Sequence, residues 1–186
     1  MIHTSPILVI SGSVRPRRIA PTIAAWVAAL GREVTGRAFE VVDLKDWPLP
    51  MDGEPDMPQT GRYALDTTRA WSGKIAAAPG FVFVTPQFNG GYPAVLKNAI
   101  DHVYAEWAGK PAMIVTYGGH GGESCGEQLA QVLRFVKAAP VKTRPALTLP
   151  RALIEANAGE IDAAAEFVAH LDELRQAFGE VAAALG

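Results

Sequence analysis

Short apolar runs alternate along this chain with longer amphipathic stretches, and no other feature of the sequence constrains the fold as strongly. The apolar runs are residues 6–11, 38–44, 80–86, 111–117 and 141–149. Apolar residues at helical spacing fill the intervals, in residues 23–30, 63–78, 95–103 and 129–136. Parallel strands joined by crossover helices have this pattern. Because the central runs are apolar almost continuously, we expect helices on both faces of the sheet and therefore a three-layer α/β sandwich.

The end of the chain predicts one long helix over residues 161–185. Its apolar stripe, which we interpret as packing surface, is Ile161, Val168, Leu171, Leu174, Phe178, Val181 and Leu185. Residues 47–61 hold too many prolines and glycines for regular structure and predict an ordered surface loop. No repeat or linker divides the 186 residues, so we expect a single domain over residues 1–186.

Composition excludes several classes of function. The 17 Lys and Arg residues are balanced by 19 Asp and Glu, so no overall field draws the protein to nucleic acid or to an anionic membrane. The one cysteine, Cys125, cannot form an internal disulfide and is expected to be a small buried residue. The first ten residues lack the pattern of a signal peptide, and no apolar run is long enough to span a membrane. We therefore expect a soluble cytoplasmic protein.

Five β-α units of this kind usually form a doubly wound sheet, either flavodoxin-like with strand order 2-1-3-4-5 or half of a dinucleotide-binding fold. In both, the ligand lies beyond the carboxyl ends of the strands. The loops after the first, third and fourth strands are therefore the places where a site is expected.

The loop after the first strand, residues 11–22, predicts an anion site. A helix is expected to begin at Pro21, and Ala20 before it offers no capping oxygen. The free N–H groups and positive end of this helix suit an anion, to which Ser13 and Arg15 would add hydrogen bonds and charge. The glycine signatures for nucleoside triphosphates and for dinucleotides are both missing, which favours a monophosphate. Solvated arginines remain the plain alternative.

The loops after the third and fourth strands predict a surface for a flat ligand. Pro86 removes a donor, and Asn89-Gly90 permits positive φ, so we expect consecutive backbone groups to be exposed around Phe88. The fourth loop has glycines at 118, 119, 121 and 122, which let a ring approach the main chain. Each loop alone could be an ordinary turn. One loop for a phosphate and two for a polar ring together indicate FMN.

At these residues the sequence resembles the NADPH-dependent FMN reductase family, which includes azo-dye, quinone and chromate reductases. The matching stretches are GSVRPRR with the following IAP, TPQFNGGYPAVLKNAID, EWAGKP and TYGGHGG, in order between residues 7 and 141. The resemblance implies a flavodoxin-like sandwich with a five-stranded parallel sheet of order 2-1-3-4-5. It also implies an FMN-dependent NAD(P)H oxidoreductase that passes hydride through flavin N5 to quinones, azo compounds, free flavin, chromate or ferric complexes, in ping-pong order. A homodimer or homotetramer is implied too, with residues 95–107 helping to complete the partner's site.

The resemblance also implies which residues bind the cofactor, with no side chain acting as catalyst. Those implied to hold the phosphate are Ser13, Arg15, Arg18, Ile19 and Ala20. Those implied to line the ring are Pro86, Gln87, Phe88, Asn89 and Gly90 on one side and Tyr117, Gly118 and Gly119 on the other. The family commonly has Pro-Glu-Tyr-Asn where this chain has Pro86-Gln87-Phe88-Asn89, so one negative charge and one hydroxyl are missing.

Two other functions match parts of the sequence less well. The stretch GESCG matches the G-x-S-x-G elbow of serine hydrolases, but Ser124 lies seven positions after the predicted strand end, and the later His170 sits in a predicted helix. Ser124 is expected instead at the start of a helix. An FMN electron carrier without NAD(P)H turnover is a second alternative, although such carriers tend to be strongly acidic and the net charge here is −2.

The remaining polar candidates are expected to have minor roles. Asp43 could imitate the acid that holds NAD ribose, but without the dinucleotide glycines, turn formation or exposure is the better interpretation. The histidines at 3, 102, 120 and 170 lack metal-ligand spacing, so no metal is expected. His120 has a place in the glycine loop from which it could contact a substrate.

Overall fold

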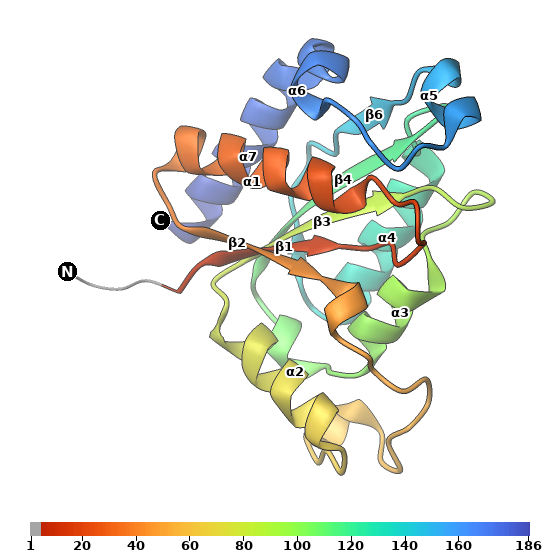
Figure 1. The fold of residues 1–186 in the computed structure, drawn as a ribbon. Helices are drawn as coiled ribbons and strands as arrows, with labels where there is room; N and C mark the ends of the chain where they lie inside the picture. The colour runs from red at the N-terminus through yellow and green to blue at the C-terminus, as the bar shows by residue number, and fades with distance from the viewer. Residues whose placement is uncertain (1–4) are drawn as a thin grey trace.

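The computed structural model describes residues 5–186, in which one parallel sheet lies between two layers of helices (Figure 1). The strands are β1 Ile7–Ser11, β2 Phe39–Asp43, β3 Phe81–Pro86, β4 Pro111–Gly118, β5 Ala139–Pro140 and β6 Ala146–Thr148. Their order is β2-β1-β3-β4-β5, and β6 also pairs with β4. The predicted flavodoxin-like order is therefore confirmed.

The last strand differs from the prediction because it is divided. β5 pairs with the first residues of β4, and β6 pairs with the last ones, where a single strand over 141–149 was expected. Between them, the N–H groups of Lys142 and Thr143 donate to the Glu180 carboxylate at 2.7 and 2.9 Å, not to β4. Pro140 and Pro145 at the two ends of this gap have no N–H for the ladder. The chain leaves the sheet here to meet the final helix.

Helices cover both faces of the sheet, as the apolar strands predicted (Figure 1). One face carries α1 Ala20–Thr35, α6 Ala163–Glu166 and α7 Leu171–Leu185, and the other carries α2 Asp66–Ala77, α3 Ala94–Asp101 and α4 Glu123–Phe135. In β1, Ile7 and Val9 belong to the first core and Leu8 and Ile10 to the second. This alternation is the two-residue period of a strand that is buried on both sides.

The C-terminal helix is broken, which corrects the prediction of one helix over 161–185. A tight turn over Val168–His170 separates α6 from α7. It turns Phe167 into the core, 5.9 Å from the Trp26 ring between centroids, and leaves Val168 61% exposed. Val168 was therefore wrongly placed in the packing stripe. The other stripe residues are buried or partly buried in the first core.

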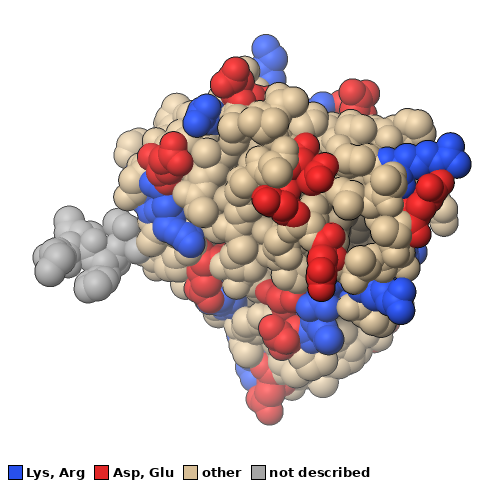
Figure 2. Space-filling view, turned by 45° about the horizontal axis from the view of Figure 1, so that its top comes forward, with Lys and Arg blue, Asp and Glu red and all other residues tan. Residues whose placement is uncertain are grey.

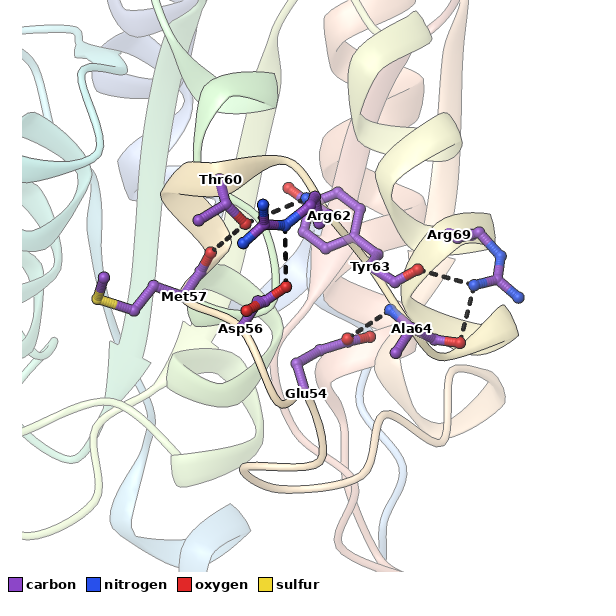
Figure 3. A network of polar contacts seen from close by, with 8 residues as sticks. All are labelled: Glu54, Asp56, Met57, Thr60, Arg62, Tyr63, Ala64 and Arg69. Atoms are coloured by element: carbon purple, nitrogen blue, oxygen red, sulfur yellow. Dashed lines mark hydrogen bonds and ion pairs between the residues drawn. The ribbon is translucent and has the colours of Figure 1, made fainter.

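The proline-rich loop is ordered by polar contacts, as expected. The Glu54 carboxylate accepts the N–H groups of Ala64 and Leu65 at 2.7 and 3.0 Å, just before α2 begins. Asp56 binds Arg62 at 3.0 Å, and the Arg69 side chain donates to backbone carbonyls of the same segment (Figure 3). Partial burial raises the pKa of Glu54, but hydrogen bonds, including those from Ala64 and Leu65, outweigh it and leave that pKa below its usual value.

Charges of both signs are interspersed on the face shown in Figure 2, without a large patch of either sign. This distribution agrees with the small net charge of −2. Among residues 5–186, no helix has the length and apolar character needed to cross a membrane.

Candidate functional site

A cavity of about 250 Å³ lies beyond the carboxyl ends of the strands, where the sequence predicted a site. The loops after β1, β3 and β4 meet there. The predicted site residues that line it are Ser13, Arg15, Arg18, Ile19, Pro86, Gln87, Phe88, Tyr117, Gly118 and Gly119. Ala20, Asn89 and Gly90 lie outside its lining. Ala20 is fully buried as the first residue of α1, and the other two form the tip of a turn.

One end of the cavity is built on the start of α1. Ile19 precedes the helix without a side-chain cap, Pro21 lies in its first turn, and that turn has no acidic residue. Within residues 5–186, the N–H groups of Arg18, Ile19 and Ala20 donate to no backbone or side-chain acceptor. Unpaired N–H groups at the positive end of a helix form a site for an anion. The predicted phosphate loop has this geometry.

Arg18 is held in this loop by an ion pair that the sequence did not reveal. Its Nη2 lies 2.5 Å from Asp43 Oδ2 at the end of β2, and the two side chains are only 13% and 15% exposed. Asp43 Oδ1 also accepts the Lys45 N–H at 3.0 Å, so the expected turn role is confirmed as well. Arg18 Nε is buried and has no partner within the described chain. An arginine on the cavity wall therefore keeps one donor without an acceptor.

Arg15 and Tyr117 link the anion end to the part of the cavity lined by the loops after β3 and β4. The Arg15 guanidinium lies 4.0 Å from the centre of the Phe88 ring, an arrangement that allows a cation-π contact. Burial raises the pKa of Tyr117 well above its usual range, although the charges of Arg15 and Arg18 oppose the increase. Tyr117 is therefore neutral at physiological pH.

The turn after β3 is tighter than expected. Asn89 and Gly90 both have positive φ, 50° and 84°, and Phe88 and Gly91 exchange N–H···O bonds of 2.7 and 3.0 Å across them. The Gln87 N–H donates to the Tyr117 carbonyl at 3.0 Å. The positive φ was predicted correctly. Phe88 and Gly91 pair with each other, whereas the consecutive N–H groups of Asn89 and Gly90 make no hydrogen bond within residues 5–186, so backbone groups are exposed only at the tip of the turn.

The glycine loop after β4 does leave backbone donors free. Within the described residues, the N–H groups of Gly119 and His120 make no backbone hydrogen bond. Gly121 has a φ of 73°, and a Cβ there would lie 2.8 Å from the Ala146 carbonyl oxygen, so the turn needs glycine at that position. Gly119 has open space except toward Ile154, whose Cδ1 would lie 3.2 Å from an added Cβ.

One wall of the cavity was not predicted. It comes from Leu149, helix α5 (Arg151–Ala156) and the following residues 157–161. Ile154 lies beside Gly119 of the glycine loop, and Gly159 lies against the Arg17 backbone, so this segment joins both ends of the cavity. A six-residue helix followed by irregular chain carries no motif by which sequence reasoning could have placed it.

The residues considered for a hydrolase or a metal site do not come together in the described structure. Ser124 is exposed in the first turn of α4, as predicted, while His170 contacts Glu173 and the Thr148 N–H. Cys125 is buried, and burial raises the pKa of its thiol to about 12. Among residues 5–186, no group of three His, Cys, Asp or Glu side chains could hold a metal. His3 lies outside the described residues.

Comparison with known proteins identifies the family of the chain. Residues 5–149 match the family described as NADPH-dependent FMN reductase. The chain belongs to the NADPH-dependent FMN reductase family. An NAD(P)H-dependent FMN reductase of Schizosaccharomyces pombe is 56% identical over 179 residues, which cover 95% of this chain and 88% of that protein. A 2-hydroxy-1,4-benzoquinone reductase of Burkholderia sp. is 33% identical over 59% of this chain and 58% of its own.

The fold is shared with solved oxidoreductases. The flavoenzyme NAD(P)H:(acceptor) oxidoreductase FerB of Paracoccus denitrificans superposes with a TM-score of 0.67 at 19% identity, covering 94% of this chain and 97% of that one. The family match and the sequence relatives confirm the prediction of an oxidoreductase family that uses FMN and NAD(P)H. The cavity lies at the strand ends where the fold places its ligands.

Proposed function

We propose that this chain is an NAD(P)H oxidoreductase that holds FMN in the cavity described above and reduces small acceptors. The observation that carries the proposal is the joining of an anion site to a glycine-lined slot. Unpaired N–H groups and arginines form one end, and Gly118 and Gly119, the latter with a free N–H group, line the other. FMN has a phosphate at one end and a flat polar ring at the other, so its chemistry matches both.

The residues at the anion end fit a phosphate monoester. Arg15, Arg17 and Arg18 line the cavity with Ser13, and the partnerless Arg18 Nε supplies a donor that lacks an acceptor. Arg18 shares its charge with Asp43, so Arg15 and the start of α1 carry most of the positive field. A phosphate here would satisfy donors that otherwise have no partner.

The ring end would position the flavin and leave part of it accessible. FMN bound here would supply the hydride chemistry, because flavin N5 can accept hydride from NAD(P)H and the reduced ring can pass electrons to an acceptor. A cavity of about 250 Å³ lies just below the usual range for small-ligand sites, so part of an FMN molecule would remain outside it and open to a second reactant. The protein contributes position and hydrogen bonds, and no side chain needs to transfer a proton.

For a quinone the balance is one NAD(P)H, one quinone and one solvent proton giving NAD(P)⁺ and the hydroquinone. Azo compounds, free flavin, chromate and ferric complexes are the other proposed acceptors. If NAD(P)H and the acceptor used the same exposed face of the bound ring in turn, the reaction would follow ping-pong order. The quinone reductase named among the relatives supports this class of acceptor.

Steady-state kinetics tests this order. With NADPH and a benzoquinone varied against each other, reciprocal plots should be parallel. Intersecting lines would show that both substrates bind together, which one shared face does not allow.

A further inference from the structure

Gln87 occupies the junction of three elements around the cavity. Its backbone N–H donates to the Tyr117 carbonyl of β4 at 3.0 Å. Its side-chain Oε1 accepts the Cys125 N–H, in the first turn of α4, at 3.2 Å. The residue itself follows β3 directly. A single side chain thus ties the end of β3 to the start of α4, whose preceding residue, Gly122, provides no side-chain cap.

The contact with Cys125 fixes the orientation of the Gln87 amide. An N–H group needs an oxygen acceptor, so the atom that faces Cys125 is Oε1, and the other atom is the NH₂ group. The Gln87 Cβ lies beside Gly122 and Gly118, where an added Cβ would lie 3.3 and 3.8 Å from it. Two N–H donors of known position therefore remain.

These donors are available to a ligand. Gln87 lines the cavity and is only partly buried. In the part of the chain that the structure describes, its Nε2 makes no hydrogen bond and is not one of the buried polar atoms that lack a partner. The donors are thus accessible from the cavity on the side where the glycine loop lies.

We propose, building on the FMN site proposed above, that Gln87 Nε2 donates a hydrogen bond to the polar edge of the flavin ring and thereby raises the reduction potential of bound FMN. The reduced ring carries more negative charge than the oxidised ring, so a fixed donor stabilises it more. Gln87 is in this sense a cofactor-tuning residue.

The substitution Gln87→Glu tests this with almost no change of shape. A glutamate oxygen still accepts the Cys125 N–H, so the junction is kept, while the donor is replaced by a negative charge. Gln131→Glu makes the same charge change at an exposed position further along α4 and serves as the control. Thermal unfolding of both variants shows whether the fold is preserved.

The measurement is the two-electron midpoint potential of bound FMN at pH 8, where the new carboxylate is ionised, together with the Kd of oxidised FMN. Gln87→Glu should weaken binding of reduced FMN relative to oxidised FMN at least tenfold, a shift of about 30 mV to lower potential. Gln131→Glu should leave the potential unchanged. If Gln87→Glu fails to retain FMN, Gln87→Met removes the donor without adding charge, at the cost of the contact with the Cys125 N–H, and must also lower the potential.

Equal potentials for the wild type and the Gln87 variants, with FMN bound, would overturn this inference and leave the proposed function intact. Failure of the wild type to bind FMN would overturn both. The two failures are therefore distinguishable in the same experiment.

Discussion

The Arg18–Asp43 ion pair should stabilise the fold far more than an exposed pair on the same strand. Asp43→Ala removes the partner of a side chain that is 13% exposed and already has one buried donor without an acceptor. Removing one member of a fully buried pair costs about 3–5 kcal/mol, and the remaining exposure of this pair reduces our expectation to about 2–3 kcal/mol. Glu40→Ala on the same strand β2 breaks the pair with Lys74, whose members are 45% and 26% exposed, and should cost at most about 1 kcal/mol.

Urea unfolding of the protein without added flavin measures the difference. Asp43→Ala should lower the unfolding midpoint by roughly 1 M with little change in the slope, and Glu40→Ala by a third of that or less. The double variant Arg18→Met, Asp43→Leu should recover most of the loss, because an apolar pair leaves no buried charge unpaired. Equal losses for Asp43→Ala and Glu40→Ala would refute the reasoning, since burial would then have no effect on the strength of the pair.

Four further predictions concern the site, the fold and assembly. Arg15→Ala should weaken FMN binding by about 2 kcal/mol without loss of the fold, measured by flavin titration of the apoprotein; equal affinities would remove Arg15 from the site. Ser124→Ala should leave quinone reduction nearly unchanged. Gly119→Val should lower both flavin content and turnover, because the valine side chain would occupy the space proposed for the flavin. The fold should tolerate this valine, since the only atom of the described chain close to an added Cβ is the flexible end of Ile154. Although partial burial opposes the effect, hydrogen bonds from Thr143 and Lys142 lower the pKa of Glu180, so its stabilisation is present above pH about 4.3 and is lost as pH falls through the lower folded-state value. Glu180→Gln should thus cost about 1 kcal/mol in urea unfolding at pH 7 and less at pH 3. Residues 95–107 are expected at a subunit interface, so light scattering should show a dimer or tetramer at micromolar concentration, and a monomer alone would contradict this.

The sequence predicted the sheet and the place of the site well because both depend on local patterns. Continuous apolar runs identify strands buried on both faces, and Pro21 after an uncapped Ala20 marks the start of a helix to within one residue. The positive φ at Asn89-Gly90 follows from the residue types alone. The position of the cavity then follows from the parallel order of the strands.

What the sequence missed depends on contacts between distant residues. Arg18 and Asp43 are 25 positions apart, and the sequence around either residue has no pattern that predicts the ion pair. Glu180 takes the N–H groups of Lys142 and Thr143 out of the sheet from 37 or more positions away, which is why the last strand is divided. Phe167 displaces Val168 from the core because Trp26 on α1 offers it a partner, so the helical period fails at that turn. The wall formed by α5 has no local pattern at all.

The absorption spectrum of the purified protein, loaded with FMN and then titrated with NADPH or NADH without oxygen, tests the central claim most directly. The account predicts a bound flavin whose visible absorption is bleached by about one equivalent of NAD(P)H and returns when a quinone is added. A protein that binds no FMN would contradict the proposed site, and a bound flavin that stays oxidised in the presence of NADPH and NADH would identify an electron carrier instead of a reductase.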